Sequence, residues 1–346
     1  MDAIAKWAPE ERAALFQETA VRRGLVPTIV EKDFWVCWTL RRLFAHPERR
    51  PAMLFKGGTS LSKVYGIIER FSEDIDLSLD RHDLGFSAER DPENVTGRKA
   101  REKLLKELKA TCAEYLRTEF VPQTIADFES VLGTHGEGWS LEIDPEEDQT
   151  VLFRYPSSTD GVSAQYIRPV VRMEFGARSD FWPATEAEVR CYAADEFPDQ
   201  FQNPVARVRV LEAKRTFWEK ATILHAEFHR QNRAGGAGRL SRHYYDLARL
   251  ATSRIRKEAL ADLALLSEVA HHKDFFFASA QARYDEARPG TLRLVPAEDL
   301  RRLLESDYRQ MAEMFFGEQP SFKEVLSTLT DLEREINEDG ASELGE

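Results

Sequence analysis

The most constraining feature of the sequence is a short apolar segment that ends in two glycines and leads into a helix-like segment. Residues 53–56 predict a strand, Gly57 and Gly58 predict a tight turn, and residues 59–65 predict the first turns of a helix. A chain that places a strand, a glycine turn and a helix in this order is expected to pack the helix against a sheet. The pattern predicts a core that contains both helices and strands.

A second strand follows and carries two carboxylates on one face. Between residues 74 and 79, apolar residues alternate with Asp74, Asp76 and Ser78, and this period of two is typical of a half-buried strand. The two Asp side chains therefore point the same way. Like charges at this spacing favour a bound cation, and Mg²⁺ is a hard ion that proteins bind through one or two carboxylates together with substrate phosphates. The alternative is a solvated strand face with two chance acidic residues.

The glycine turn favours the metal interpretation, because it offers a place for a phosphate beside the carboxylates. The backbone N–H groups of Gly57 and Gly58 could approach a phosphate closely, and the hydroxyls of Thr59 and Ser60 could donate further hydrogen bonds. We assign Lys63, in the same helical segment, to the nucleotide as well. The alternative is a tight turn capped by Ser or Thr, which are favoured capping residues.

A third carboxylate is expected near the Asp pair, since two-metal phosphoryl-transfer sites use one to bridge a metal or to accept a proton. Glu174 is our candidate for this catalytic role. It shares the polar face of a strand-like segment with Arg172, opposite apolar neighbours. A salt bridge on the sheet surface is an equally good interpretation of the same residues.

Helical patterns lie on both sides of this region. Apolar residues recur at helical spacing between residues 9 and 46, and helical segments again predominate after residue 210. We expect N-terminal helices at 1–50, an α/β or α+β core at 51–204, and a helical C-terminal domain at 205–346 that ends in an acidic tail. Within the helical part, Lys220 and Asp246 are charged residues in aromatic-containing segments. Lys220 could contact a triphosphate as a point charge, or it could belong to a solvated helix face.

Composition narrows the class of protein. A net charge of −12 argues against non-specific coating of nucleic acid, although a loop with Arg230, Arg233, Arg239 and Arg242 is a local basic patch or a plain solvated loop. The three cysteines lack the spacing of a disulfide framework or a zinc site. No apolar run approaches the roughly 20 residues of a membrane span, and no signal peptide is evident. We therefore expect a cytoplasmic protein with no membrane partner.

Several blocks together resemble the AbiEii/AbiGii-type nucleotidyltransferase toxins. The blocks are residues 29–35, 55–63, 70–77, 219–220 and 242–247. The resemblance implies an α+β fold with a polymerase-beta-like nucleotidyltransferase core, a mixed sheet and a helical C-terminal domain. By position, Gly58 and Thr59 match the family's Gly-Ser motif, Asp74 and Asp76 its metal ligands, Lys220 its nucleotide-contacting lysine, and Asp246 its late acidic residue. Two departures are Thr59 in place of Ser, and His243 where many relatives have a first Asp.

The resemblance also implies an activity and its partners. It implies transfer of a nucleotide from an NTP to an acceptor hydroxyl with Mg²⁺, or Mn²⁺ in its place, and RNA as the acceptor, with tRNA 3′ ends in some members. It further implies the toxin of a toxin–antitoxin or phage-defence pair, whose antitoxin is a separate protein. Two alternatives remain open: the same chemistry on a protein or a small molecule, and a module that binds nucleotide without catalysis.

Overall fold

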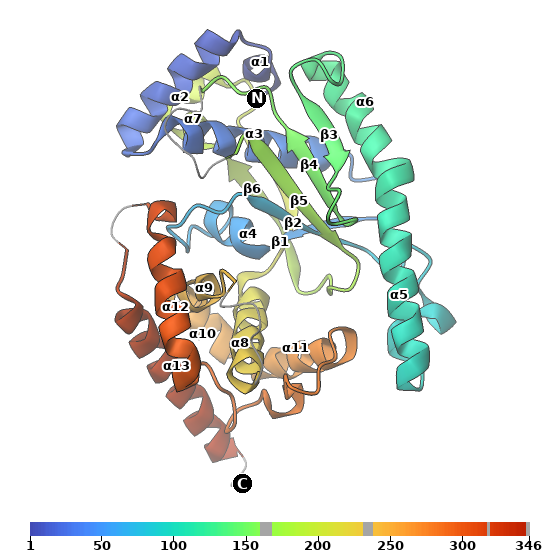
Figure 1. The fold of residues 1–346 in the computed structure, drawn as a ribbon, viewed down its shortest axis with the longest axis vertical. Coiled ribbons are helices and arrows are strands. Elements are labelled where there is room, and N and C mark those ends of the chain that lie inside the picture. The colour runs from blue at the N-terminus through green and yellow to red at the C-terminus, as the bar shows by residue number, and fades with distance from the viewer. Residues whose placement is uncertain (160–167, 231–237, 317–318, 344–346) are drawn as a thin grey trace. The chain divides into compact units, whose positions relative to one another are not determined.

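The computed structural model describes residues 1–159, 168–230, 238–316 and 319–343, and the chain divides into two compact units. The first unit comprises Met1–Val64 and Ser72–Val210, and the second comprises Tyr65–Phe71 and Leu211–Glu346 (Figure 1). A short segment that precedes the Asp pair thus belongs to the helical unit. The predicted domain boundaries after residues 50 and 204 remain a proposal.

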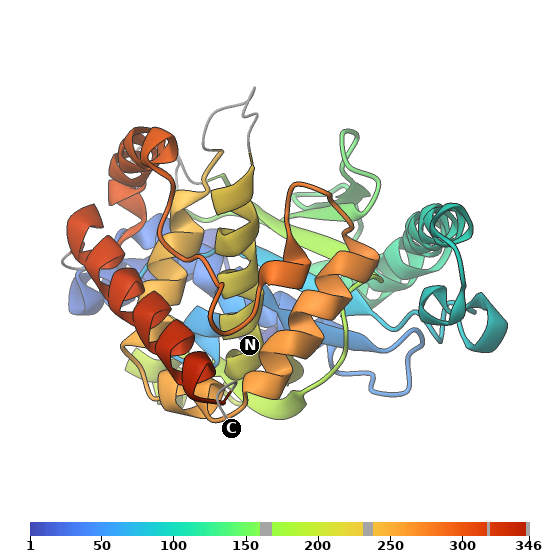
Figure 2. The ribbon, with the colours of Figure 1, turned by 90° about the horizontal axis from the view of Figure 1, so that it is seen from below.

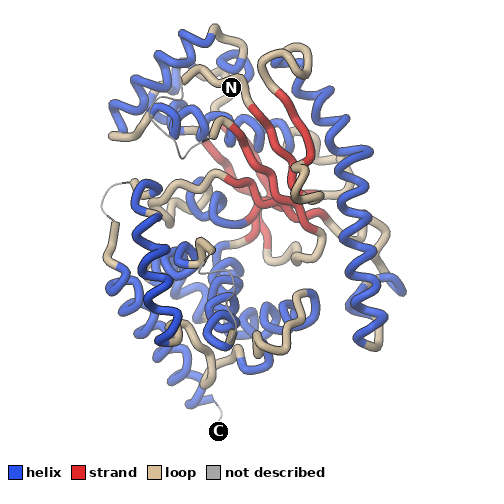
Figure 3. The backbone as a smooth tube through the Cα atoms, viewed as in Figure 1, coloured by secondary structure: helices blue, strands red, loops and turns tan. Residues whose placement is uncertain are grey.

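The first unit is built on a seven-stranded mixed sheet with the order β3-β4-β5-β2-β1-β7-β6 (Figure 3). The strands are β1 (Met53–Lys56), β2 (Asp74–Leu79), β3 (Ser140–Ile143), β4 (Thr150–Arg154), β5 (Val170–Gly176), β6 (Ala184–Arg190) and β7 (Val205–Leu211). Strand β2 lies between β1, to which it is antiparallel, and β5, to which it is parallel. The predicted α+β class with a mixed sheet is confirmed.

Helices of the first unit form its apolar core with the sheet. They are α1 (Asp2–Ala5), α2 (Pro9–Arg23), α3 (Pro27–Leu43), α4 (Gly57–Lys63), α5 (Arg98–Tyr115), α6 (Val121–Leu132) and α7 (Tyr192–Glu196). Helix α3 begins with proline, which suits the first helical position, and it is buried without a break from Thr28 to Leu40. Its Trp35 and Trp38 contact Phe153 of β4, with ring centroids 6.0 and 5.8 Å apart.

This core decides which face of the sheet is polar. Phe153 pairs with Val171, and Met173 pairs with Ile75, so these buried side chains share the face that packs on the tryptophans. Side chains alternate between faces along a strand. Asp74 and its polar neighbours therefore lie on the opposite face from the aromatic core.

The second unit is formed by helices (Figure 2). They are α8 (Ala213–His229), α9 (Ser241–Ala251), α10 (Ile255–Leu260), α11 (Leu263–Phe276), α12 (Glu298–Gln310) and α13 (Phe322–Glu343). Helix α8 packs against α9, α10 and α11, and α9 also packs against α12 and α13. The predicted helical C-terminal part is confirmed. Across the described ranges, none of the helices has the length and apolar character that crossing a membrane requires.

The segment Tyr65–Phe71 is attached to these helices through its backbone and its first side chain. The Tyr65 hydroxyl donates to the Leu211 carbonyl at 2.8 Å, and the Phe71 amide donates to the Met314 carbonyl at 2.6 Å. The carbonyl of Glu69 accepts from the amide of Phe316 at 2.8 Å. Arg70 is thereby held inside the helical unit.

Candidate active site

Three predicted carboxylates meet on the polar face of the sheet. Asp74 and Asp76 are half-buried and alternate with the buried Ile75 and Leu77 along β2. In the parallel pairing of β2 with β5, Asp76 is aligned with Glu174 and Asp74 with Arg172. Residues aligned across neighbouring strands project on the same side of a sheet. The structure therefore brings Glu174 to the Asp pair, as the alternation along its strand predicts.

The Asp74 carboxylate is in an environment that disfavours its negative charge. Burial, followed by the nearby negative charges of Glu174, Glu73 and Asp76, raises the pKa of Asp74 to about 6, although Lys32 lowers it. Among the described residues, none donates a hydrogen bond to this carboxylate. A buried carboxylate that lacks donors and has like-charged neighbours is stabilised by a bound cation.

Gly57 makes room for Asp76. A Cβ atom at position 57 would lie 1.8 Å from Asp76 Oδ2 and 2.5 Å from its Cγ, closer than any real contact allows. The backbone φ of Gly57 is also +77°, in the left-handed region that favours glycine. The first glycine of the turn is thus needed both for its backbone conformation and for the position of a proposed metal ligand.

The other predicted residues of the turn already have partners within the first unit. The Thr59 hydroxyl donates to the backbone carbonyl of Asp74, and the Ser60 hydroxyl donates to the Gly57 carbonyl at 2.8 Å. Both side chains are fully buried. Their hydroxyls fix α4 to β2 and close its first turn, so their predicted contact with a phosphate would require these bonds to open. Gly58 is only half-buried.

Lys63 is also engaged. Its ammonium donates to Asp33 at 2.5 Å and lies 3.9 Å from the centroid of the Tyr192 ring. Burial alone would lower the pKa of Lys63, but the Asp33 carboxylate outweighs it and raises the pKa above its usual value. The structure thus places Lys63 in a buried ion pair, and its predicted contact with the nucleotide remains a prediction.

Glu174 satisfies both interpretations made from the sequence. It is aligned with Asp76, and it also accepts a hydrogen bond from Arg172 Nε at 3.0 Å. The same guanidinium donates to Asp144 at 2.7 Å and to Glu147 at 3.0 Å. Arg172 therefore draws Glu174 toward the β3–β4 hairpin, and its charge partly compensates the carboxylates of this face.

The donors on this face fit a hard divalent cation held by few protein ligands. Within the described ranges, no group of three or more His, Cys, Asp or Glu side chains is arranged to hold a metal ion. Asp74 and Asp76 supply two carboxylates, while Glu174 is paired with Arg172. Mg²⁺ is usually bound through one or two carboxylates, with substrate phosphates and water completing its shell. The pair thus fits a metal that arrives with a nucleotide.

The second unit brings Lys220 and Asp246 together with a residue that the predicted site leaves out. Arg70 donates to both Asp246 carboxylate oxygens at 2.8 Å, and Lys220 donates to one of them at 2.7 Å. Asp246 is fully buried. Burial alone would raise the pKa of Asp246, but Arg70 and Lys220 outweigh it and hold the pKa well below its usual value.

Besides Asp246, the described neighbours that act on Lys220 include the cations Arg70 and Arg242 and the ring of His243. Its ammonium lies 3.1 Å from His243 Nδ1. Burial and the charge of Lys220 hold the pKa of His243 well below 6.5, so the ring is neutral and its Nδ1 accepts the hydrogen bond. Burial lowers the pKa of Lys220 itself, which Asp246 opposes. Two buried cations therefore share one carboxylate.

Sequence reasoning leaves three contributors out of the predicted site: Arg70, Arg172 and Lys32. Arg70 and Lys32 are long cations whose partners are distant in the chain, so only the folded structure shows these pairings. Arg172 pairs with Glu174, two residues away, and also with the distant Asp144 and Glu147. Arg70 and Lys32 do lie inside blocks that resemble the family. In the predicted basic loop, Arg233 lies outside the described residues, and Arg230 pairs with Glu227 at 2.9 Å.

Comparison with known proteins decides the family. The family described as "Nucleotidyl transferase AbiEii toxin, Type IV TA system" matches residues 38–328. The chain belongs to this family. It is therefore a nucleotidyltransferase toxin of a type IV toxin–antitoxin system, and membership implies an NTP substrate and a separate antitoxin.

Other comparisons add little. No curated protein matches the sequence. Among solved structures, the chain is similar to MenT4, a nucleotidyltransferase toxin from Mycobacterium tuberculosis H37Rv, with 14% identity, a TM-score of 0.40, and coverage of 95% of this chain and 98% of that chain.

Proposed function

We propose that the protein transfers a nucleoside monophosphate from an NTP to a hydroxyl at the 3′ end of an RNA, with tRNA as the acceptor. The observation that carries the proposal is the polar sheet face, where the Asp74 and Asp76 carboxylates share one side of β2 and Glu174 is aligned beside them. The lack of described donors to Asp74 supports a cation there. Family membership supports the nucleotide as the transferred group.

Asp74 and Asp76 would hold Mg²⁺, or Mn²⁺ in its place. When bound, the ion would neutralise charge on the nucleotide phosphates and favour departure of pyrophosphate. In the displacement, the acceptor oxygen forms a bond to the α-phosphorus, the bond to the β-phosphate bridging oxygen breaks, and the acceptor hydroxyl loses its proton. Glu174, which is aligned with Asp76, would accept that proton.

Backbone geometry supports access of the triphosphate to this face. Gly57 and Gly58 have no side chains to exclude a phosphate, and the Cβ that Gly57 lacks would also displace Asp76. Lys220 remains a proposed contact of the nucleotide. Asp246 is proposed to act through Lys220 and Arg70, because its two oxygens are already bound by them.

A second class of acceptor has one observation in its favour. A cavity of about 670 Å³ borders Glu174 and is lined by the carboxylates of Asp144, Glu146, Glu147 and Asp148, with Lys109 and Arg117 as its cations. Excess negative charge opposes a polyanion and favours a basic partner. A hydroxyl on a basic protein or on a cationic small molecule is therefore the alternative acceptor.

The deciding experiment offers all acceptors together. The protein is incubated with Mg²⁺, each NTP labelled at the α-phosphate, total cellular RNA and total protein, beside an Asp74→Asn/Asp76→Asn variant. Label in RNA only with the intact pair supports the proposal and names the nucleotide. Label in protein, or in an added aminoglycoside, favours the second acceptor class. Nucleotide binding without release of pyrophosphate under any condition would overturn the transferase mechanism for this chain.

A further inference from the structure

Helix α3 carries three consecutive charged residues that are all buried. Glu31, Lys32 and Asp33 have relative exposures of 0%, 3% and 4%. Successive residues of a helix point about 100° apart, so three neighbours project in three directions. A buried charge is costly unless it is paired and hydrogen-bonded. Each of these residues therefore needs its own partners.

Lys32 joins the segments that lead into two active-site strands. Its ammonium donates to the carboxylate of Glu73 and to the backbone carbonyl of Arg168, the latter at 3.1 Å. Glu73 immediately precedes β2, and Arg168 lies just before β5. These parallel neighbours carry the three proposed active-site carboxylates. One buried ammonium thus connects the entries of both strands.

Asp33 fixes the end of the glycine helix. One carboxylate oxygen accepts from Lys63, the last residue of α4, and the other accepts from the backbone amide of Tyr192 at 2.6 Å. Helix α4 begins at Gly57, whose position controls Asp76. The Asp33 carboxylate therefore holds the segment that leaves room for a proposed metal ligand.

Glu31 holds the loop that follows β4. Its carboxylate accepts from the hydroxyls of Ser157, Ser158 and Thr159 and from the amides of Ser158 and Thr159. Five donors from three consecutive residues compensate its charge. The three members of the triplet thus bind segments that adjoin strands β2, β4 and β5 and the end of helix α4.

We propose that Glu31, Lys32 and Asp33 are positioning residues of the active site, and that Lys32 sets the placement of β2 relative to β5. Lys32 acts through Glu73 and the Arg168 carbonyl and does not touch the reacting groups. This inference rests on the proposed function, because the strands that it aligns carry the proposed carboxylates. The competing explanation is that Lys32 only neutralises Glu73.

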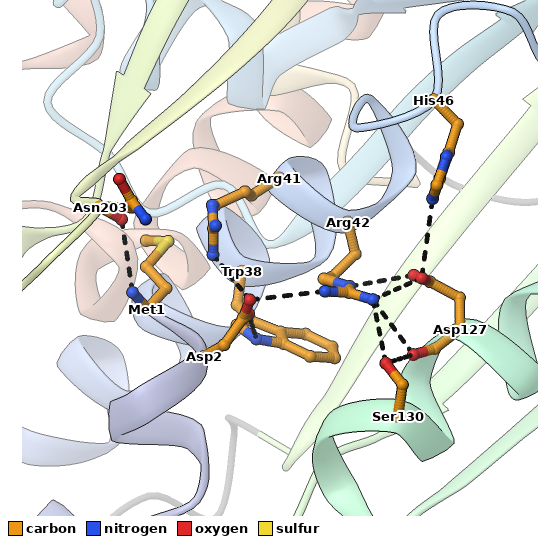
Figure 4. Close-up of polar contacts among 9 residues, drawn as sticks. All are labelled: Met1, Asp2, Trp38, Arg41, Arg42, His46, Asp127, Ser130 and Asn203. Atoms are coloured by element: carbon orange, nitrogen blue, oxygen red, sulfur yellow. Dashed lines mark hydrogen bonds and ion pairs between the residues drawn. The ribbon is translucent and has the colours of Figure 1, made fainter.

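The same helix supplies a matched control. Arg42 donates to Asp127 of α6 through Nε at 2.9 Å and lies 3.4 Å from Asp2 of α1, whose other carboxylate oxygen accepts from the Trp38 indole (Figure 4). Its side chain is 17% exposed and that of Asp127 is 16% exposed. Arg42→Met thus removes a largely buried ion pair of α3 whose partners carry none of the proposed carboxylates.

The experiment compares four variants: Lys32→Met, Lys32→Arg, Lys32→Met/Glu73→Gln and Arg42→Met. Transfer from α-labelled NTP into total cellular RNA gives kcat and KM, and binding of Mn²⁺ alone is measured by titration calorimetry. The double variant leaves no uncompensated charge, so it is expected to fold even if Lys32→Met does not. Thermal unfolding of each variant verifies this.

If Lys32 positions the strands, kcat should fall about 10- to 100-fold in Lys32→Met and in the double variant. The KM for NTP should change by no more than about threefold. Mn²⁺ affinity falls about tenfold in the double variant. Lys32→Arg regains most of the activity, because a guanidinium can donate both to the Glu73 carboxylate and to the Arg168 carbonyl. Arg42→Met leaves kcat and Mn²⁺ affinity unchanged.

Recovery of wild-type kcat and Mn²⁺ affinity in the double variant would overturn the proposal, since only neutralisation of Glu73 would then matter. Equal losses in Lys32→Met and Arg42→Met would also overturn it, in favour of a general effect on stability. If the wild-type protein transfers no label, the proposed function fails. A weakened Mn²⁺ affinity confined to the Lys32 variants would still support positioning in that case.

Discussion

Two regions of this protein bury aspartates in opposite ways. Asp246 in the helical unit is surrounded by donors, with Arg70 on both oxygens and Lys220 on one. Asp74 on the polar sheet face receives no hydrogen bond from the described residues, and its nearest charged influences are mostly negative. The pKa of Asp246 is lowered and that of Asp74 is raised, although burial acts to raise the pKa of both carboxylates.

The charge of Asp246 is compensated by other residues of the protein, whereas the charge of Asp74 is left to be compensated by a ligand. A paired buried carboxylate resists removal of either partner, because the remaining charge is left uncompensated. A carboxylate that lacks partners costs stability in the free protein, and active sites are where proteins retain such costs. The two aspartates should therefore respond in opposite ways to the same substitution.

The largest expected effect is on activity at the sheet face. Asp74→Asn, alone or with Asp76→Asn, should reduce nucleotide transfer by about 10³-fold, because several kcal/mol of transition-state stabilisation would be lost. Its thermal unfolding temperature should be equal to or above that of the wild-type protein, since a like-charge repulsion is removed. An active Asp74→Asn variant, or one that is markedly less stable, would contradict the assignment.

The same substitution in the helical unit should act on stability. Asp246→Asn leaves Arg70 and Lys220 buried without a compensating charge, and we expect a loss of about 3–5 kcal/mol in the free energy of unfolding. Urea denaturation measures it. Lys220→Met is the control, because Asp246 keeps both bonds to Arg70, so the loss should be smaller. Equal stability of wild-type and Asp246→Asn proteins would remove the contrast between the two regions.

A glycine substitution tests whether the position of Asp76 matters. Gly57→Ala places a methyl group against Asp76 Oδ2, so we expect about 100-fold slower transfer from displacement of that carboxylate. Gly24 is the matched control, because its φ is +65° and a Cβ there meets nothing within 4 Å. Gly24→Ala should cost about 1 kcal/mol of stability and leave the rate unchanged. Similar rates in the two variants would show that only backbone strain is involved.

The parts of the site that sequence predicts are those with local signals. Alternation along residues 74–79 and around Glu174 gives the face of each carboxylate, and the strand alignment then brings the two strands together. The protein partners of Thr59 and Lys63 are not predicted because they come from other segments, and Ser60 bonds within its own turn. A hydroxyl or ammonium in a phosphate-binding pattern has the same sequence signal whether it faces a ligand or, as here, the protein.

Long-range pairing also explains what sequence misses. Arg70 and Asp246 are separated by 176 positions, and nothing in their local sequence indicates a bidentate ion pair. The fold class is easier to predict from the sequence, since the helical periodicity after residue 210 and the strand pattern before it are both local signals. The assignment of Tyr65–Phe71 to the helical unit is not local, because it depends on hydrogen bonds to the backbone of residues 211, 314 and 316.

The smallest expected effect is the pH dependence that the two aspartates give to stability. The pKa of Asp74 is raised from 3.8 to about 6 in the folded protein. The contribution of Asp74 to stability is therefore fully present below pH 3.8 and is lost as the pH rises through 6. In the absence of metal, the free energy of unfolding of Asp74→Asn should therefore rise relative to that of the wild-type protein between about pH 4 and pH 7. The expected change is on the order of 1 kcal/mol after solvent screening.

Asp246 should contribute to stability in the opposite pH range. Its pKa is lowered, so its contribution is present above the unfolded value and is lost only as pH falls through the folded one. The stability difference between the wild-type protein and Asp246→Asn should then stay constant from about pH 5 to pH 7. Urea unfolding in EDTA across this range measures both differences. Parallel pH profiles for the two variants would show that the carboxylates do not differ in compensation, and that the polar sheet face has no special need for a cation.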